Sequence, residues 1–246
     1  EQFKGYLPAS LRQPLFSTLG EAWPKLDWAP RGLRLKTTLQ ALGESRAEGY
    51  HRAISAILPD RFWNMLNPDA RSELTGYDPV DLTRKYIAAA GTDDPVLAAQ
   101  YVDFRTWLPG RMLVKTDRSA MANSLEVRPP LLDYRLVEWA ARLPRAFKLA
   151  NGEGKLVLKK ASEPRLPKEI LYREKQGFGL PVAAWLRASE NNPLDRLGRS
   201  AAWRRHGFLD DRVIDRMIAA HKAGRSDYSQ ELWSVLMYDA FLSQAA

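Results

Sequence analysis

Residues 94–108 read DPVLAAQYVDFRTWL, and the spacing of their apolar side chains decides the fold class. These side chains recur every three or four positions, at Val96, Leu97, Tyr101, Phe104 and Leu108. Such a period is typical of a helix with one buried face. Asp94 offers a capping oxygen, and Pro95 fits the first helical position. The sequence therefore predicts a helix that starts after Asp94 and ends near Pro109-Gly110.

The same signals recur along the chain. Asn67-Pro68 and Asp78-Pro79 predict two more helix starts. Further helices are expected at 111–125, after Asp133, at 155–161, after Asp210, and through 232–241. No segment alternates with period two for long enough to predict a strand. The polar stretch 186–206, broken by Pro193 and Gly198, is expected to be a loop or connection.

We therefore predict a mostly all-α fold in a single domain over residues 1–246. Its parts are a helical lead-in at 1–90, a set of helices and a glycine-containing loop at 91–185, and C-terminal helices at 186–246.

Composition narrows the function. The 246 residues contain no Cys and three His, which excludes disulfides and thiol catalysis and argues against a metal centre. No apolar run approaches the roughly 18 residues of a membrane span, so a cytoplasmic protein is expected. The net charge of +8 favours anionic partners. The basic residues alternate with apolar ones at helical spacing, so a nucleic-acid partner is not expected.

Two stretches could carry chemistry. REKQGFGLP, residues 173–181, places Lys175 beside Gly177 and Gly179. Glycine-rich backbone next to a lysine can bring a cation and bare N–H groups to a phosphate, although a surface loop can read the same way. NGEGK at 151–155 lacks the spacing of a phosphate loop, and we interpret it as a turn before the helix at 155–161.

The second stretch lies at 108–133. Lys115, Asp117 and Arg118 fall within one helical turn, and Glu126 and Arg128 follow. Such a cluster can hold a polyanion while a carboxylate positions a ribose or an amine. The alternative, which the residue types alone favour, is an ion-pair network that ties neighbouring helices together.

The order of these features resembles a known family. LVKTDRSAMANSLEVRPPLLDYRLVEWAARLP (113–144) and LPKEILYREKQGFGLPVAAWLR (166–187) closely resemble the C-terminal part of the synthetase domain of glutamine-dependent asparagine synthetases. The stretch LGEAWPKLDWAPRGLRLKTTLQAL (19–42) is similar to the asparagine synthetase-like amidotransferases of exosortase and PEP-CTERM exopolysaccharide systems. With SQELWSVLMYDAFL at 229–242, the resemblance covers essentially the whole chain.

The resemblance implies ATP and Mg²⁺ chemistry. A glutaminase domain would supply ammonia, ATP would adenylate a carboxylate such as that of aspartate, and ammonia would displace AMP to leave an amide. Lys175 matches the lysine that reaches the ATP phosphates, and Gly177 and Gly179 would let the backbone come close. The family positions that border the nucleotide and acceptor pocket are Lys115, Asp117, Arg118, Glu126 and Arg128.

Two departures from the family pattern matter. The SGGxDS loop, the DGxDE segment and the N-terminal Cys are absent, so the parallel α/β core of the ATP-pyrophosphatase domain is expected upstream. The chain alone would then be inactive and bind no cofactor tightly; a homodimer fits the resemblance.

Arg111 stands where many relatives carry an acidic residue. Two alternatives follow from this reversal of charge: amidation of a sugar or exopolysaccharide carboxylate, and ring closure on the same framework. A helical binding module without chemistry is the remaining alternative.

Overall fold

The computed structural model describes residues 8–23, 39, 42–174, 177, 179–188, 192–198 and 201–245. The structure is mostly helical, as predicted, with two short strands in the described part. The chain forms two compact units, the first from residues 1–50 and 80–176 and the second from 51–79 and 177–246. That these two units assemble into a single domain over residues 1–246 stays a prediction.

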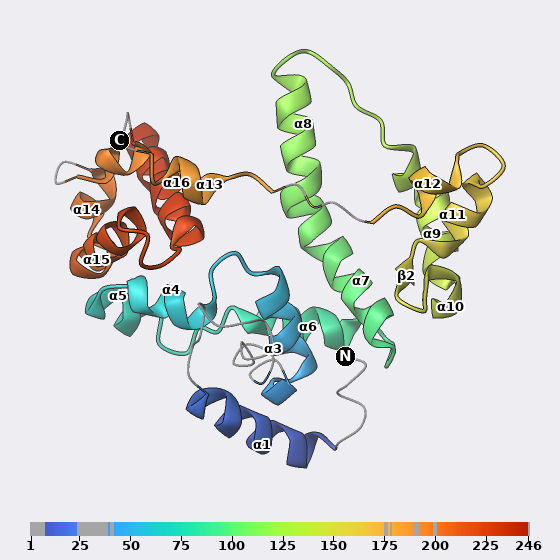
Figure 1. Cartoon of the computed structure of the whole chain (residues 1–246), viewed down its shortest axis with the longest axis horizontal. Helices are drawn as coiled ribbons and strands as arrows, with labels where there is room; N and C mark the ends of the chain where they lie inside the picture. Colours follow the sequence, from blue (N-terminus) through green and yellow to red (C-terminus); the bar gives the residue numbers. More distant parts are fainter. Residues whose placement is uncertain are drawn as a thin grey trace. The chain divides into compact units, whose positions relative to one another are not determined.

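The first unit contains most of the described helices (Figure 1). They are α1 (Ala9–Ala22), α3 (Arg46–Ile54, divided by the unit boundary), α6 (Val80–Ala89), α7 (Pro95–Arg105), the π-helix η3 (Leu108–Leu113), α8 (Val114–Met121), the 3₁₀-helix η4 (Pro130–Leu132), α9 (Tyr134–Arg142), α10 (Arg145–Lys148), α11 (Leu156–Ser162) and α12 (Lys168–Leu171). Its strands are β1 (Leu149–Ala150) and β2 (Glu153–Gly154).

The second unit is a helical bundle assembled from two separate stretches of chain. Its elements are α4 (Pro59–Met65), α5 (Pro68–Glu73), α13 (Val182–Trp185), the 3₁₀-helix η5 (Pro193–Leu197), α14 (Ala202–His206), α15 (Asp211–Lys222) and α16 (Ser229–Ala245).

Side-chain caps start several helices where the sequence predicts them. The Asp94 carboxylate accepts hydrogen bonds from the N–H groups of Val96 and Leu97, at 2.8 and 3.1 Å. The carboxylate of Asp210 does the same for α15, and Asn67 and Asp133 cap α5 and α9. Each cap satisfies backbone donors that the first helical turn leaves without partners.

The end of the first long helix is where the prediction is wrong. α7 ends at Arg105, four residues before Pro109, because Thr106 leaves the helical region with φ −127°, and the chain is helical again at Pro109-Gly110. It continues through η3 into α8, so that α7 and α8 follow one another closely (Figure 1). Proline has no N–H and cannot make the regular helical bond, and a local π-helix accommodates such a residue by widening the turn. The predicted helix at 111–125 is thus shorter and begins within this π-helix.

A small hairpin was also not predicted. β1 and β2 pair antiparallel around Asn151-Gly152, whose φ angles are 52° and 77°. Two consecutive left-handed residues make the tight turn that matches strand twist, and Asn-Gly is its strongest sequence signal. The predicted turn before a helix is confirmed, since α11 begins at Leu156, but the turn joins two strands.

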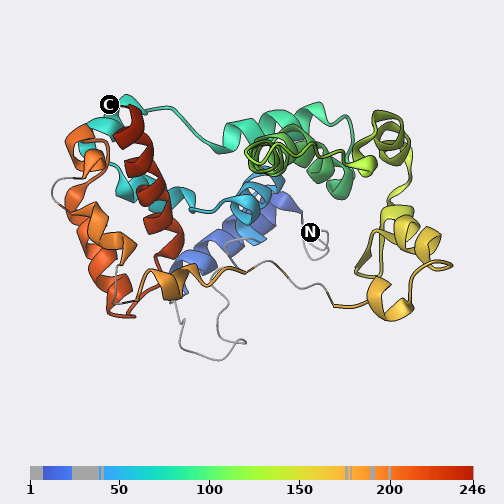
Figure 2. The same ribbon diagram turned by 90° about the horizontal axis from the view of Figure 1, so that it is seen from above.

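The core of the second unit includes residues that the sequence assigns to a loop. Leu194, Leu197 and Trp203 are buried against α15 and α16, so the loop prediction is wrong for the described part of 186–206. Figure 2 shows α16 running beside α14 and α15. Backbone bonds from Asn67 N–H to the Phe208 carbonyl (3.1 Å) and from Asp210 N–H to the Met65 carbonyl (2.8 Å) add α4 and α5 to this bundle.

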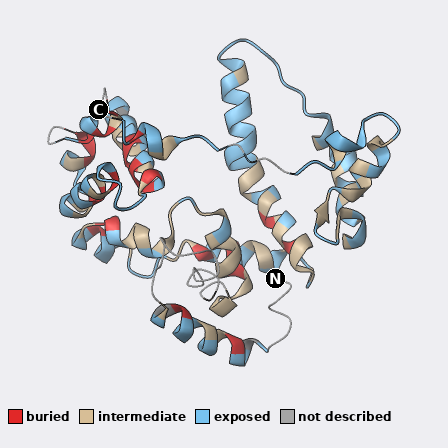
Figure 3. Ribbon diagram, in the orientation of Figure 1, coloured by how far each residue is buried: buried red, intermediate tan, exposed pale blue. Residues whose placement is uncertain are grey.

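Burial in the first unit is confined to its early helices. Ala98 and Val102 on α7 have no exposed surface, whereas none of the described residues from 103 to 185 is buried. Figure 3 shows α8 exposed over most of its length, and Ala120 is its one residue of intermediate burial. The described helices include none that is both long and apolar enough to cross a membrane.

Candidate functional site

The π-helix η3 holds a charged side chain in a defined place. The Arg111 guanidinium lies 4.2 Å from the centre of the Trp107 ring, a cation–π distance. No carboxylate among the described residues pairs with Arg111, so its positive charge remains available to a ligand. π-helical turns occur often at functional sites, because the widened turn redirects the side chains that follow.

The helix α8 carries three of the predicted site residues. Lys115, Asp117 and Arg118 are all exposed, and Lys115 and Arg118 lie one turn apart on the same face. None of the three forms an ion pair with another described residue, so the ion-pair network that the residue types favoured is not found in that part of the chain. Lys115 and Arg118 thus form an exposed cationic face beside Asp117, and such a face is suited to an anion.

Glu126 and Arg128 lie on the extended segment after α8. They pair with each other, and their side chains are 67% and 87% exposed. An exposed pair of this kind contributes little to stability, since water screens both charges. The two side chains neutralise each other and so differ from the uncompensated cations of α8.

The glycine-containing loop is described only in part, and Lys175 lies outside the described residues. The Gly179 N–H donates to the Gly177 carbonyl at 3.0 Å. Neither glycine has a left-handed φ, and an added Cβ would meet nothing within 4 Å at either position. The chain's own packing therefore does not require glycine here, and the space that a side chain would occupy is open to a ligand.

The residue before the loop, Tyr172, is hydrogen-bonded to Glu163, which follows the last residue of α11. The Tyr172 hydroxyl donates to Glu163 Oε1 at 2.5 Å, and Lys160 Nζ donates to the same oxygen at 3.0 Å. The hydrogen bond from Tyr172 lowers the pKa of Glu163, with help from Lys160. The same bond raises the pKa of Tyr172, because the phenolic proton is shared with a carboxylate.

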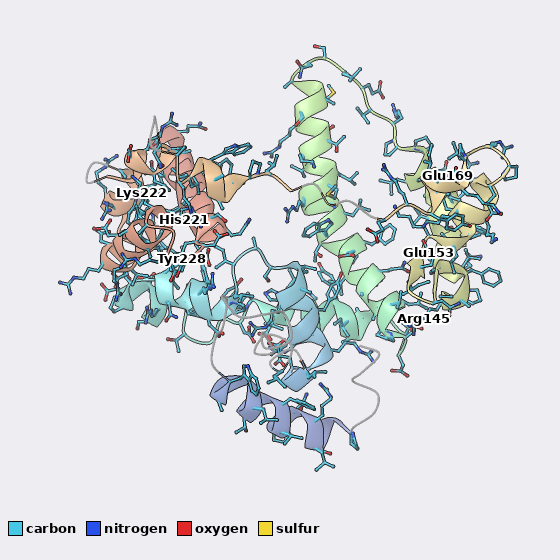
Figure 4. All side chains as sticks on the ribbon, in the orientation of Figure 1. Arg145, Glu153, Glu169, His221, Lys222 and Tyr228 are labelled. Carbon is cyan, nitrogen blue, oxygen red and sulfur yellow. The ribbon has the colours of Figure 1, made fainter. Side chains whose placement is uncertain are left out.

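The residues after the loop are tied to His221, a fully buried side chain at the end of α15. His221 Nδ1 accepts from the Tyr228 N–H at 3.1 Å, which leaves the ring proton on Nε2 to donate to the Ala183 carbonyl at 3.3 Å. Figure 4 shows His221 and Tyr228 in the bundle of the second unit. Sequence reasoning missed His221, because no motif marks it.

The predicted site residues thus fall into three groups. Lys115, Asp117 and Arg118 share α8, and Glu126 pairs with Arg128, all in the first unit, whereas Gly177 and Gly179 belong to the second. The free cations of α8 fit phosphate oxygens. No group of three or more His, Cys, Asp or Glu in the described part could hold a metal ion, so those residues do not fit a Mg²⁺ site of their own.

Comparison with known proteins identifies the class. The family model described as asparagine synthase matches residues 1–243, so the chain belongs to the asparagine synthase family. No solved structure matches the chain significantly.

Individual relatives agree with this assignment. The putative glutamine-hydrolysing asparagine synthetases of Mycobacterium bovis and Mycobacterium tuberculosis are 34% identical over 97% of the chain, which covers 37% of each relative. Asparagine synthetase 1 of Bacillus subtilis is 32% identical over 64% of the chain and 25% of its own length. The chain therefore spans little more than a third of the length of these Mycobacterium relatives.

Proposed function

We propose that this chain forms part of an ATP-dependent, glutamine-hydrolysing amidotransferase of the asparagine synthetase type. In the proposed reaction a carboxylate oxygen of the acceptor attacks the α-phosphorus of ATP, and pyrophosphate leaves. Ammonia released from glutamine then attacks the acyl carbon, and AMP leaves as the amide forms. Family membership over residues 1–243 and the printed names of the relatives support this reaction class.

The observation that carries the proposal is the exposed pair of cations on α8, neither of which forms an ion pair with a described residue. Lys115 and Arg118 lie one turn apart and have no carboxylate partner in the described part of the chain. Phosphoryl transfer places little covalent work on a protein and depends on positioning and on offsetting negative charge. Lys115 and Arg118 would bind the polyanion, and Asp117 beside them would accept a hydrogen bond from a ribose or an amine.

Lys175 has the central role in this proposal. Its ammonium would offset the charge that builds on the α-phosphate and on the departing pyrophosphate, as a fixed electrostatic group does in other transition states. The open space beside Gly177 and Gly179 supports close approach of a ligand to this backbone. Glu126 and Arg128 would border the acceptor pocket, and the Mg²⁺ that accompanies ATP would take its protein ligands from elsewhere.

The exposed apolar side chains of residues 103–185 indicate contact with another part of a longer protein. Large apolar side chains stand open to solvent at Met112, Leu113, Val114, Met121, Leu125, Val127, Leu131, Tyr134, Leu136, Trp139, Phe147, Leu158, Leu166, Ile170, Tyr172 and Leu180. Exposed apolar side chains in this number, on a stretch without a buried residue, favour contact with a further protein surface. We assign it to the ATP-pyrophosphatase and glutaminase parts of a longer protein, so we expect no AMP formation by residues 1–246 alone.

The test uses the longest protein that the reading frame encodes. Lys175→Ala should lower glutamine-dependent AMP release by about 100-fold or more, as loss of one preorganised electrostatic group does, while glutamine hydrolysis continues. Lys175→Arg should recover part of the activity, because it restores the charge with a different shape. Full AMP release by the alanine variant would exclude the proposed role of Lys175.

The α8 cations need a separate test. Lys115→Ala and Arg118→Ala should raise the KM for ATP, whereas Lys155→Ala, which removes an exposed cation just before α11, should not. Equal effects of the three substitutions would show that net charge, and not the α8 surface, controls ATP binding.

A second candidate keeps the chemistry and changes the acceptor. Arg111 is held against Trp107 with its charge free of any described carboxylate, which favours an acceptor that lacks the positively charged ammonium group of aspartate. A uronic acid or another exopolysaccharide carboxylate meets that description, in keeping with the exosortase-associated resemblance of residues 19–42. Competition assays with aspartate and glucuronate as acceptors, read out as AMP release, would distinguish the two.

A further inference from the structure

Two arginines in the described part of the chain lie directly over a tryptophan ring. Arg111 of η3 lies 4.2 Å from the centre of the Trp107 ring. Arg204 of α14 lies 4.4 Å from the centre of the Trp203 ring. In such a pair the ring occupies one face of the flat guanidinium, and the N–H donors at its edge remain for other partners. The role of each pair then depends on what these donors meet.

The edge of Arg204 binds two carboxylates. Its guanidinium nitrogens lie 3.1 Å from Asp211 Oδ2 and 2.5 Å from Asp215 Oδ1. Its Nε also donates to the Leu197 carbonyl at 3.2 Å, and the Arg204 side chain is 12% exposed. A guanidinium that stacks on tryptophan and holds carboxylates at its edge is therefore already part of this protein's own packing.

Arg111 has a similar stack with an open edge. Its side chain is exposed, and no described residue accepts a hydrogen bond from the guanidinium or forms an ion pair with it. Arg105 also has no ion pair with a described residue, but it lies farther from its ring, at 5.7 Å from the centre of Tyr86. Arg111 thus combines a close stack with N–H donors that are available to a ligand.

The open edge of Arg111 suits a carboxylate. A planar guanidinium matches the two oxygens of a carboxylate with two parallel N–H donors. The ring already limits the rotamers of the arginine, so binding costs less conformational entropy. A carboxylate held at both oxygens is a poor nucleophile, because its lone pairs are engaged and its charge is offset. Arg111 therefore suits a carboxylate that is recognised, and not one that attacks ATP.

We propose that Arg111 binds a second, non-reacting carboxylate of the acceptor, and that Trp107 is the positioning residue that holds its guanidinium. The assignment to the acceptor rests on the proposed function, whereas carboxylate binding by Arg111 does not. The acceptor class is then a dicarboxylate, or a polymer that carries carboxylates at intervals. A phosphate also presents paired oxygens to a guanidinium, so phosphate serves as the competing probe.

The first experiment measures carboxylate binding by the 246-residue chain without nucleotide. The nuclear magnetic resonance signal of Arg111 Nε–H, identified by its loss in Arg111→Lys, is followed as acetate is added. Arg142 is the internal control, because it is exposed at the end of α9 and no described ring lies beneath it. We expect an apparent Kd about two- to tenfold lower at Arg111, since the stack removes part of the entropy cost.

Two outcomes of this titration would overturn the inference. One is an equal response of Arg111 and Arg142 to acetate. The other is a preference for inorganic phosphate over acetate that is larger at Arg111 than at Arg142, which would make Arg111 a phosphate ligand.

The second experiment tests Trp107. Trp107→Leu removes the ring, and the Kd of Arg111 for acetate should rise to that of Arg142. Trp107→Phe keeps an aromatic face and should retain part of the difference. Trp139→Leu, at a tryptophan of α9 that is 51% exposed, is the control and should leave the Kd of Arg111 unchanged. An unchanged Kd in Trp107→Leu would exclude the positioning role, and the phenylalanine variant tests the same point if the leucine variant does not fold.

The third experiment tests the acceptor class in the longest encoded protein. Glutarate and pentanoate have equal chain lengths and differ by one terminal carboxylate. Glutarate should inhibit AMP release with aspartate as acceptor at about tenfold lower concentration than pentanoate. Arg111→Gln should abolish this difference, whereas Arg142→Gln, which removes the same net charge, should keep it. Equal inhibition by the two compounds would overturn the second carboxylate.

These measurements separate the inference from the proposed function. A flat titration of Arg111 in a protein that releases AMP would remove the inference and leave the proposed function standing. Absence of AMP release would remove the proposed function and the assignment to an acceptor. Carboxylate binding by Arg111 would still be decided by the titration, which needs no turnover.

Discussion

Arg61 of α4 and Glu231 of α16 form an ion pair of 2.5 Å across 170 positions of sequence. The Glu231 side chain is 4% exposed and the Arg61 side chain 34%. Arg61 also lies over the Tyr228 ring, 5.7 Å from its centre. The pair therefore joins the two separate stretches of chain that make up the second unit.

Breaking this pair should be costly. Arg61→Met would leave the Glu231 carboxylate buried without its partner, and we expect a loss of about 3 kcal/mol in the free energy of unfolding. The control is Lys222→Met, which breaks the exposed pair with Asp195 (2.7 Å) and should cost at most about 1 kcal/mol. Urea unfolding followed by circular dichroism measures both, and equal losses would contradict the assignment of Glu231 as a buried, dependent charge.

Trp203 should contribute more to stability than any exposed tryptophan. Its side chain is fully buried in the core of the second unit, so Trp203→Ala should lower the free energy of unfolding by about 3–5 kcal/mol. Trp233→Ala is the matched control, because Trp233 on α16 is 42% exposed and should cost much less. Similar unfolding midpoints for the two variants would show that residues 201–206 are not part of the core.

The start of α3 predicts a pH effect. The Ser45 N–H donates to Glu48 Oε2 at 2.9 Å, and the Glu48 N–H donates to the Ser45 hydroxyl at 3.3 Å, a reciprocal capping box. The bond from the Ser45 N–H is the main reason that the pKa of Glu48 is below its usual value of 4.5.

A lowered pKa in the folded state means that ionised Glu48 stabilises the fold above about pH 4.5. This contribution is lost as the pH falls through the lowered pKa. The stability difference between the native chain and Glu48→Gln should therefore be constant near neutral pH and vanish at lower pH. Thermal unfolding from pH 3 to pH 7 measures it, and a difference that grew on acidification would have the wrong sign.

Arg111 should affect the acceptor more than the nucleotide. Arg111→Glu reverses the charge beside Trp107, and in the longest encoded protein we expect the KM for an anionic acceptor to rise about tenfold with little change for ATP. Arg111→Lys keeps the charge and weakens the stacking, so its effect should be smaller. A rise confined to the KM for ATP would place Arg111 on the nucleotide side.

Local rules predicted much of the helical framework. Asp94 and Asp210 cap helices where their sequence contexts indicate, since a short polar side chain before an apolar-periodic run has few other roles. These rules did not predict the π-helix, because Pro109-Gly110 is also a pair of residues that normally ends a helix. The same rules did not predict that Trp203 and its neighbours are buried. Residues 186–206 are polar on average, and the few apolar residues among them are buried only by tertiary packing.

The contacts of the candidate site residues were harder to predict from the sequence than the helices. Lys115 and Arg118 could be placed on one helical face from their spacing alone. Whether they pair with acidic residues depends on which helices pack against α8. The spacing of residues in the sequence does not determine this. His221 shows the limit most clearly, because its ring nitrogens bond to the Ala183 carbonyl and the Tyr228 N–H, two backbone groups that no residue type encodes.

The second unit cannot fold completely until its later stretch of chain has been synthesised. Residues 51–79 leave the ribosome first, and all of residues 80–176 must be translated before the partner stretch begins at 177. At about 5–20 residues per second this interval lasts roughly 5–20 seconds. During that time Met65 and Leu66 have no bundle to enter, so α4 and α5 wait as nascent chain while the helices of the first unit can already assemble.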